Sequence, residues 1–194
     1  MHVKFCGMTN LEDVLASLDL GVDFIGFVFY KKSPRYIKAQ DVKEIIQKIP
    51  KQTNSVGVFV EEIEEEIEEE IVSIMNYCGL RYAQVYNDFN IQNTIRVYRI
   101  DDVLPQKLSD GLILLDSKTP QIGGSAQRFN WKILEDCNDL SRAFVAGGIS
   151  EDNIFEIARY KPYGVDLVSS IETYPGKKDH SKMKNFMENL RRIK

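Results

Sequence analysis

The stretch HVKFCGMTNLEDVLASLDLGVDFIGFVF, residues 2–29, decides the fold. It begins and ends with short apolar runs that are rich in β-branched and aromatic side chains, as buried strands are. Between these runs, Thr9 and Glu12 have the spacing of a helical capping box, and Leu20-Gly21 is a typical helix end. The stretch therefore predicts a strand, a helix and a second strand.

The same alternation continues to the end of the chain, which indicates strands and helices around a parallel sheet. The eight expected strands span residues 2–5, 24–29, 55–59, 82–85, 96–99, 111–115, 142–146 and 164–168. Eight such units predict an α/β protein, a compact single-domain (β/α)8 TIM barrel over residues 1–194. An open doubly wound sheet is the alternative architecture.

Amphipathic segments place the remaining helices between the strands. They are expected at residues 41–49, 62–78, 131–137, 151–160 and 182–193. Residues 86–95 and 100–110 have room for a helical turn or two at most, so the fourth and fifth helices are expected to be trimmed. The acidic run 61–70 carries isoleucines at helical spacing, which favours a barrel helix with a solvated glutamate face over an acidic docking surface.

Composition excludes several classes of protein. With 43% hydrophobic residues and a net charge of −4, the chain fits one globular domain and lacks the basic character of nucleic-acid binders. No apolar run is long enough for a membrane span or a signal peptide, so we expect a cytoplasmic protein with no membrane partner. Three cysteines without a CxxC pair and only two histidines argue against a metal site, a disulfide framework and a histidine-based triad.

Barrel enzymes carry their reacting groups where the strands end. Cys6 ends the first expected strand near the start of a helix, whose positive end could stabilise a thiolate base. Asp116 follows an apolar run, where loss of solvation would raise the pKa of its carboxyl group toward that of a general acid. A small buried cysteine and an ordinary turn aspartate are the structural alternatives.

Two further loops are candidates for binding anions. Gly147-Gly148 follows the seventh strand, with Ser150 as the expected cap of the next helix, and could bind a phosphate through backbone N–H groups. Arg35 lies in a basic loop after the second strand and could bind a carboxylate through two N–H groups. A tight turn and solvated surface charge, respectively, are the alternatives.

Several motifs, in order along the chain, resemble those of the phosphoribosylanthranilate isomerase family of tryptophan biosynthesis. They are KFCGMT at 4–9, GVDFIGFVF at 21–29, KSPRYI at 32–37, LLDSK at 114–118 and YPGKKDH at 174–180. The resemblance implies an Amadori rearrangement of N-(5′-phosphoribosyl)anthranilate, a small phosphosugar substrate, without a cofactor. It also implies a monomer or homodimer.

The resemblance assigns a role to each candidate residue. Asp116 would be the general acid and Cys6 the general base. Arg35 would bind the anthranilate carboxylate, and Asp166 at the eighth strand would face the ribose. The phosphate would be held by Gly147, Gly148, Ser169 and Ser170.

Three loops depart from the family pattern. After the fourth strand, Tyr86-Asn87 replaces the expected His-Gly; in the sixth loop, 123–127 lacks an expected glycine and lysine; and Ile171-Glu172 follows Ser169-Ser170 where a glycine is expected. These changes keep open a drifted or non-catalytic phospholigand-binding barrel. Two related phosphosugar barrels fit less well, because indole-glycerol-phosphate synthase would need a partner lysine and the histidine-pathway isomerase an aspartate at position 6.

Overall fold

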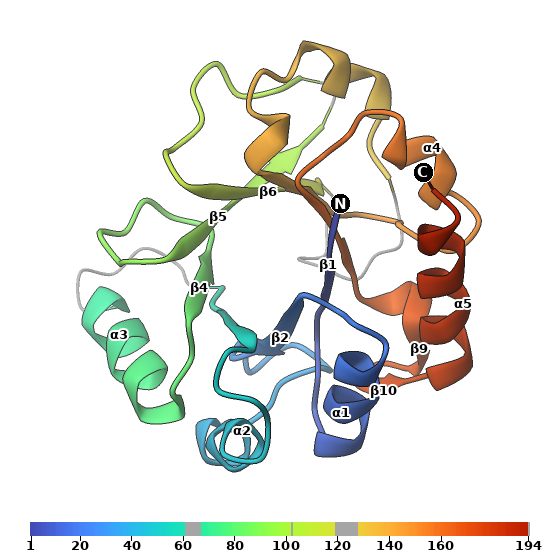
Figure 1. The fold of residues 1–194 in the computed structure, drawn as a ribbon. Helices are drawn as coiled ribbons and strands as arrows, with labels where there is room; N and C mark the ends of the chain where they lie inside the picture. Colours follow the sequence, from blue (N-terminus) through green and yellow to red (C-terminus); the bar gives the residue numbers. More distant parts are fainter. Residues whose placement is uncertain (61–66, 102, 119–127, 194) are drawn as a thin grey trace.

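The computed structural model describes residues 1–60, 67–101, 103–118 and 128–193. Eight parallel strands follow one another around a closed barrel, and β8 pairs with β1 through four residue pairs, from His2↔Gly164 to Phe5↔Leu167 (Figure 1). The strands are β1 His2–Phe5, β2 Phe24–Val28, β3 Asn54–Val58, β4 Tyr82–Val85, β5 Thr94–Ile100, β6 Leu112–Ser117, β7 Ala143–Val145 and β8 Gly164–Leu167. The predicted barrel is confirmed, and the open sheet is excluded because both sheet edges are paired.

The helices surround part of this barrel. They are α1 Leu11–Asp19, α2 Ala39–Ile46, α3 Ile67–Cys78, α4 Ile154–Ala158 and α5 His180–Arg191. In the described parts of the crossovers from β4 to β5 and from β5 to β6 the chain forms no helix, which agrees with the predicted trimming (Figure 1). A short antiparallel pair, β9 Glu172–Tyr174 and β10 Lys177–Lys178, precedes α5.

Two predicted helices differ from the structure. The segment predicted as a helix over 131–137 is the 3-10 helix Trp131–Asp136, and the helix predicted over 151–160 is reduced to α4. In both segments the amphipathic pattern is present, since Trp131, Leu134, Ile154 and Ile157 are buried, but it covers little more than a turn. Helices this short depend on tertiary packing more than on propensity.

The predicted capping box at the start of α1 is wrong by one residue. Asn10 is the cap: its side-chain oxygen accepts the N–H of Asp13 at 2.9 Å, and its amide donates to the Asp13 carboxylate at 2.8 Å. Thr9 instead donates its hydroxyl to the carbonyl of Gly176. Asparagine caps helices as well as threonine does, so the sequence pattern alone could not separate the two positions.

Alternation along the strands separates two environments. In β1, Val3 and Phe5 pack outward in the same core as the helices, while Lys4 points into the barrel and binds Asp166. Near the start of the strands the interior is aromatic, with the rings of Phe24 and Phe144 5.1 Å apart. The interior thus changes from apolar where the strands begin to polar where they end.

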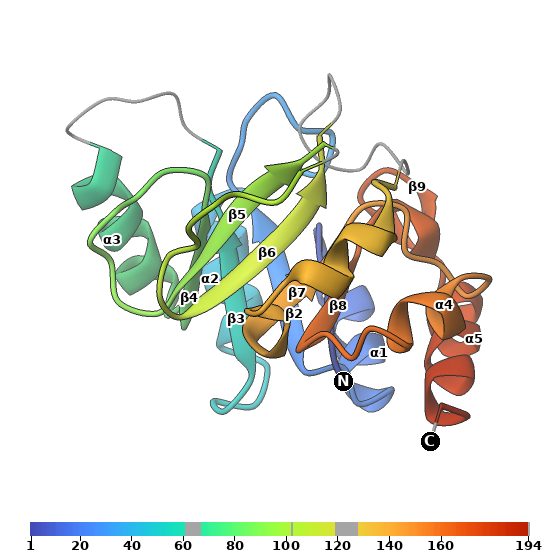
Figure 2. The same ribbon diagram turned by 90° about the horizontal axis from the view of Figure 1, so that it is seen from above.

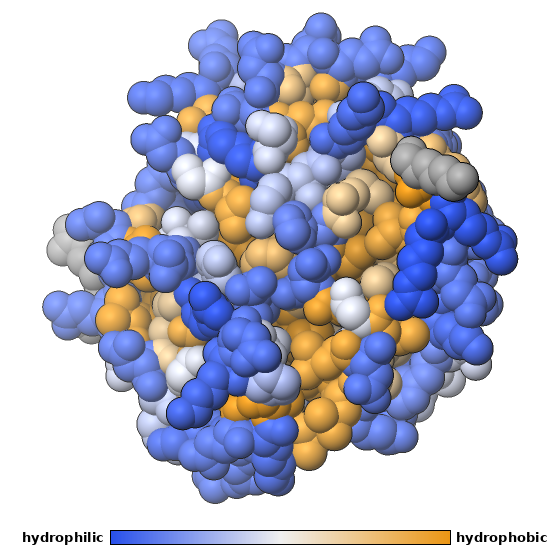
Figure 3. All heavy atoms as spheres, in the orientation of Figure 1, coloured by the Kyte–Doolittle hydropathy of each residue, from blue (hydrophilic) through white to orange (hydrophobic). Residues whose placement is uncertain are grey.

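The surface agrees with the composition. Figure 3 shows mostly hydrophilic residues, with apolar residues between them, on the face seen in Figure 1. Both termini lie near the end of the barrel where the strands begin (Figure 2).

The acidic run forms part of α3. In this helix Ile67 and Ile71 are buried while Glu69 and Glu70 are exposed, which is the predicted solvated glutamate face. Residues 61–66 of the acidic run lie outside the described residues. Within the described ranges, no helix has the length and apolar character needed to cross a membrane.

Candidate active site

A cavity of about 800 Å³, including its open mouth, lies where the barrel strands end. Its walls come from both sides of the barrel, which brings together residues that are far apart in the sequence. They include every site residue predicted from the sequence: Cys6, Arg35, Asp116, Gly147, Gly148, Asp166, Ser169 and Ser170. Their convergence is a property of the structure, whereas their individual roles stay predictions.

Cys6 follows β1 and is 4% exposed. Burial raises the pKa of its thiol above the ordinary value, and the ammonium groups of Lys4 and Lys178 oppose this effect. The expected help from a helix start is not found, since α1 begins only at Leu11 and the net effect on the thiol is upward. Any thiolate must therefore be favoured by side-chain charges rather than by α1.

Lys4 and Asp166 form a buried ion pair beneath the cavity. Their side chains are 0% and 5% exposed, and Lys4 Nζ donates to Asp166 Oδ1 at 2.9 Å. Burial lowers the pKa of Lys4, whereas the negative charge of Asp166 raises it. The net pKa of Lys4 is raised, so its ammonium group stays charged. Because residues two apart on a strand face the same side, this charge and the Cys6 thiol share the barrel interior.

Asp116 lies on β6 and faces the same cavity. Burial, reinforced by the negative charge of Asp166, raises the pKa of its carboxyl group to about 6. The N–H of Ser117 donates to Asp116 Oδ1 at 2.9 Å, which fixes the orientation of the group. A carboxyl group with this pKa can hold a proton near neutral pH and is suited to donate it.

The expected phosphate loops line one part of the cavity. Gly147 and Gly148 both have positive φ angles, 83° and 68°, which residues other than glycine rarely adopt. Ser169 and Ser170 form the turn Ser169–Ile171, and the Ser170 hydroxyl is buried without a hydrogen-bond partner among the described residues. Ser150 does not cap α4, because α4 begins at Ile154.

Arg35 is not solvated surface charge. Its side chain is 10% exposed, and it binds the carboxylate of Glu172 through Nε at 3.0 Å and Nη2 at 2.7 Å. The neighbouring Lys31 and Lys32 are exposed, as predicted. Arg35 therefore faces the cavity as a guanidinium already fixed by one carboxylate.

Sequence reasoning did not assign three polar residues of this region to the site. Gln84 lines the cavity, and its side-chain oxygen is buried without a partner among the described residues. Tyr86 also lines the cavity. Burial is the main cause that raises the pKa of its hydroxyl, and the negative charge of Asp116 adds to this effect. The third is Lys4, for which the available signal was a charged residue inside an apolar strand two positions before Cys6. The described residues contain no group of histidine, cysteine and acidic side chains suited to a metal ion.

Gly26 in β2 makes room for the Cys6 side chain. A Cβ atom at this position would lie 2.6 Å from Cys6 Sγ and 3.1 Å from Cys6 Cα. A glycine inside a strand often marks such a close approach. We expect Gly26→Ala to destabilise the protein by about 1–3 kcal/mol, because overpacked interiors are strained. Thermal unfolding followed by circular dichroism measures this change.

A double variant isolates the contact behind this prediction. If the Cys6 sulfur is the clashing atom, Cys6→Ala should restore part of the stability lost in Gly26→Ala, since coupled neighbours are not additive. An equal loss of stability in both backgrounds would contradict the assigned contact.

Comparison with known proteins gives one consistent result. The family described as "PRAI: N-(5'phosphoribosyl)anthranilate (PRA) isomerase" matches residues 3–189. A relative from a Nitratiruptor species, named N-(5'-phosphoribosyl)anthranilate isomerase, is 39% identical and is covered over 97% of both chains.

Solved structures agree with the sequence comparison. A crystal structure of phosphoribosyl anthranilate isomerase from Thermus thermophilus has a TM-score of 0.88 at 27% identity, with all of both chains covered. Another phosphoribosyl anthranilate isomerase, in complex with reduced 1-(o-carboxyphenylamino)-1-deoxyribulose 5-phosphate, has a TM-score of 0.80 at 30% identity over 98% of both chains.

Proposed function

The chain belongs to the N-(5'-phosphoribosyl)anthranilate isomerase family of tryptophan biosynthesis, and we propose that Asp116 and Cys6 are the acid and the base of its reaction. The reaction is the Amadori rearrangement of N-(5′-phosphoribosyl)anthranilate to 1-(2-carboxyphenylamino)-1-deoxyribulose 5-phosphate. The proposal rests on one observation: Cys6 and Asp116 line the same cavity, in which the pKa of Asp116 is raised to about 6. The predicted monomer or homodimer stays a prediction.

Asp116 acts first. Its protonated carboxyl group donates to the ring oxygen of the ribose, the bond from this oxygen to the anomeric carbon breaks, and the nitrogen lone pair completes an iminium ion. The ring oxygen must gain a proton as it leaves, because an alkoxide is a poor leaving group. Burial raises the pKa of Asp116 to about 6, so part of the carboxyl group is still protonated near neutral pH.

Cys6 acts second. Its thiolate removes the proton from the neighbouring sugar carbon, and the electron pair moves toward the iminium nitrogen to give an enolamine. This intermediate tautomerises to the ketone, so the substrate is isomerised without net gain or loss of atoms. The positive charges of Lys4 and Lys178 favour the thiolate that this step requires.

The remaining cavity residues bind the two ends and the centre of the substrate. Arg35 binds the anthranilate carboxylate, and the two turns that contain Gly147-Gly148 and Ser169-Ser170 bind the phosphate through N–H groups and the Ser170 hydroxyl. Asp166 faces the ribose hydroxyls. Binding at both ends holds the sugar between the acid and the base, which lowers the entropic barrier.

The direct test is turnover by the purified protein. N-(5′-phosphoribosyl)anthranilate is unstable, so it is generated in situ, and loss of its anthranilate-type fluorescence is followed. We expect catalytic turnover without any added cofactor. Absence of turnover together with measurable binding of a phosphate ester would instead support the non-catalytic phospholigand-binding barrel.

The pH dependence of kcat/KM reports on the two groups. The productive form has Asp116 protonated and Cys6 ionised, although the pKa is about 6 for the first and above the ordinary 9.0 for the second. Below a pH of about 6, ionised thiol increases with pH while Asp116 stays protonated, so kcat/KM should rise. Between the two pKa values the gain and the loss cancel, and above the thiol pKa kcat/KM should fall.

Asp116→Asn is the control for this profile. Its amide does not titrate, so the residual kcat/KM should keep rising with pH until the thiol is ionised, with no plateau. A plateau that begins at the same pH in wild type and Asp116→Asn would contradict the assignment of the acidic limb to Asp116.

A further inference from the structure

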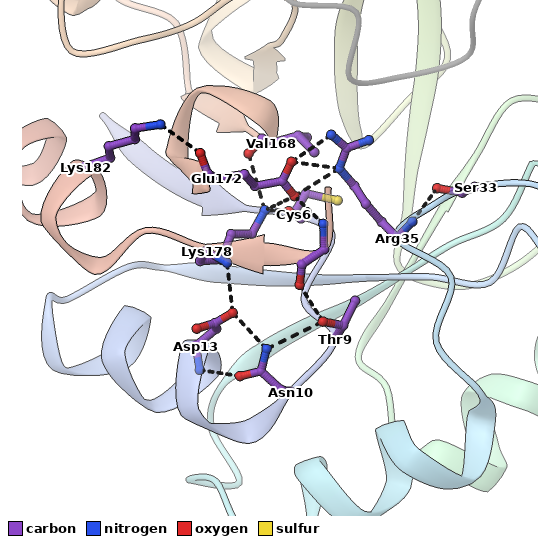
Figure 4. Close-up of polar contacts among 11 residues, drawn as sticks. Cys6, Thr9, Asn10, Asp13, Ser33, Arg35, Val168, Glu172, Lys178 and Lys182 are labelled. Carbon is purple, nitrogen blue, oxygen red and sulfur yellow. Dashed lines mark hydrogen bonds and ion pairs between the residues drawn. The ribbon is translucent and has the colours of Figure 1, made fainter. Parts of the chain in front are cut away.

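A buried polar cluster lies beside Cys6. It consists of Arg35, Glu172 on β9 and Lys178 on β10, which are 8%, 5% and 2% exposed (Figure 4). Charged residues are almost never this deeply buried unless they are paired. Burial lowers the pKa of Lys178, and the Glu172 carboxylate opposes this effect. When Lys178 is protonated, the cluster holds two cations and one carboxylate and carries an excess positive charge beside the cavity.

Lys178 binds the main chain of the proposed base. Its Nζ donates to the carbonyl oxygen of Cys6 at 2.6 Å, to Glu172 Oε1 at 3.0 Å and to the carbonyl oxygen of Val168 at 3.3 Å. An ammonium group has three protons, and each of them has an acceptor here. Lys178 thereby joins the residue after β1 to the residue after β8.

Glu172 binds the other members of the cluster. Its carboxylate accepts from Lys178, from Nε and Nη2 of Arg35, and from the N–H of Gly176 at 3.1 Å. The Arg35 side chain passes close to Gly7, which leaves room for it, since a Cβ atom at this position would lie 2.7 Å from Arg35 Cδ. The hydrogen bonds to Glu172 thus hold the guanidinium of Arg35 in place.

We propose that Lys178 and Glu172 are positioning residues of the isomerase site, with Lys178 fixing Cys6 and Glu172 fixing Arg35. The inference rests on the proposed roles of Cys6 and Arg35. Neither positioning residue needs to touch the substrate. Lys178 holds the base where it meets the sugar, and Glu172 leaves the remaining N–H edge of Arg35 for the substrate carboxylate.

A purely structural clamp would not affect the ionisation of the Cys6 thiol. The charged or titratable groups that act on this thiol come from several elements: Lys4 on β1, Asp166 on β8, Lys178 on β10 and Tyr86 after β4. Lys4 and Lys178 both favour the Cys6 thiolate. When the charge of Lys178 is removed, the ammonium group of Lys4 is the one of this pair that remains. The ionisation of Cys6 therefore responds to the charge of Lys178, and burial and Lys4 act on the same thiol more strongly.

The experiment compares Lys178→Met with Lys177→Met. Lys177 is the neighbouring residue, but it pairs with Glu12 and Asp13 outside the site. The pH dependence of Cys6 alkylation by iodoacetamide is followed by mass spectrometry of the peptide that begins at Phe5. We expect the midpoint to rise by about one pH unit in Lys178→Met and kcat to fall about tenfold or more, with no change of either in Lys177→Met.

Two further variants complete the test. Lys178→Arg keeps the charge and should return the alkylation midpoint toward that of wild type; if Lys178→Met does not fold, Lys178→Gln serves as the neutral variant. Glu172→Gln should raise KM about tenfold or more without raising the alkylation midpoint, because it loosens Arg35 but removes no positive charge.

Each outcome has a distinct meaning. An alkylation midpoint that is the same in wild type and the neutral Lys178 variant overturns the role of Lys178, and an unchanged KM in folded Glu172→Gln overturns that of Glu172. Full activity of Cys6→Ala would overturn the proposed base itself. That result leaves the alkylation data unaffected, so the two failures can be told apart.

Discussion

Replacing Cys6 by alanine is expected to lower kcat by about 10²- to 10⁴-fold, the usual contribution of a positioned acid or base. In the proposed mechanism, the substitution removes the thiolate that takes the proton from the sugar carbon, and alanine has no group that could accept this proton. KM should change little, because the proposed mechanism brings Cys6 into contact with the substrate only at the reacting carbon. Steady-state kinetics with substrate generated in situ measures both constants.

Cys78→Ala is the matched control for this prediction. Cys78 is also buried, but it lies at the end of α3, where its thiol donates to the carbonyl oxygen of Ala39. The Cys78→Ala variant should be less stable than the wild-type protein but should keep the wild-type kcat. Wild-type kcat in Cys6→Ala would show that another group removes the proton, and the proposed mechanism would then be wrong.

Replacing Asp116 by asparagine is expected to have an effect on kcat of similar size, about 10²- to 10⁴-fold. The amide has nearly the same shape as the carboxyl group but has no acidic proton to give to the ring oxygen. Ring opening should then become rate-limiting. Asp101→Asn is the control, because Asp101 follows the adjacent β5 but is exposed and pairs with Lys118.

Stability separates loss of catalysis from loss of folding in Asp116→Asn. The pKa of Asp116 is about 6 in the folded protein and 3.8 as the ordinary value, so the folded state favours the protonated carboxyl group. The stability this provides is present below the unfolded pKa and is lost as the pH rises through about 6. At pH 8 the neutral amide should therefore unfold at a melting temperature no lower than that of wild type. A clearly lower melting temperature would mean that the activity loss reflects misfolding.

The fold was predictable because its signals are local. Each strand is recognised from a few consecutive apolar residues, and each helix from spacing within about two turns. Errors occur where local signals are ambiguous: Thr9 and Asn10 are both good caps, and residues 131–137 fit a 3-10 helix as well as an α-helix. Tertiary contacts, such as the one between Thr9 and the distant Gly176, decide between such alternatives.

The candidate site was predictable to a smaller extent. The rule that barrel strands end at the active site, together with the family resemblance, selected Cys6, Asp116 and Arg35. The direction of the pKa change at Asp116 also followed from its apolar neighbours. The pKa of Cys6 did not, because burial of its thiol depends on the strands that surround it.

The amino-acid sequence by itself determined the order of the strands, the barrel class and the identity of the proposed acid and base. Only the tertiary structure decided what supports them: Lys178 binds the Cys6 carbonyl across 172 positions, and Glu172 binds Arg35 across 137. Such contacts exist only after β8 closes onto β1, so no local pattern can encode them. The same closure buries Asp116 and Cys6 together, and this burial sets the protonation of the proposed acid and base.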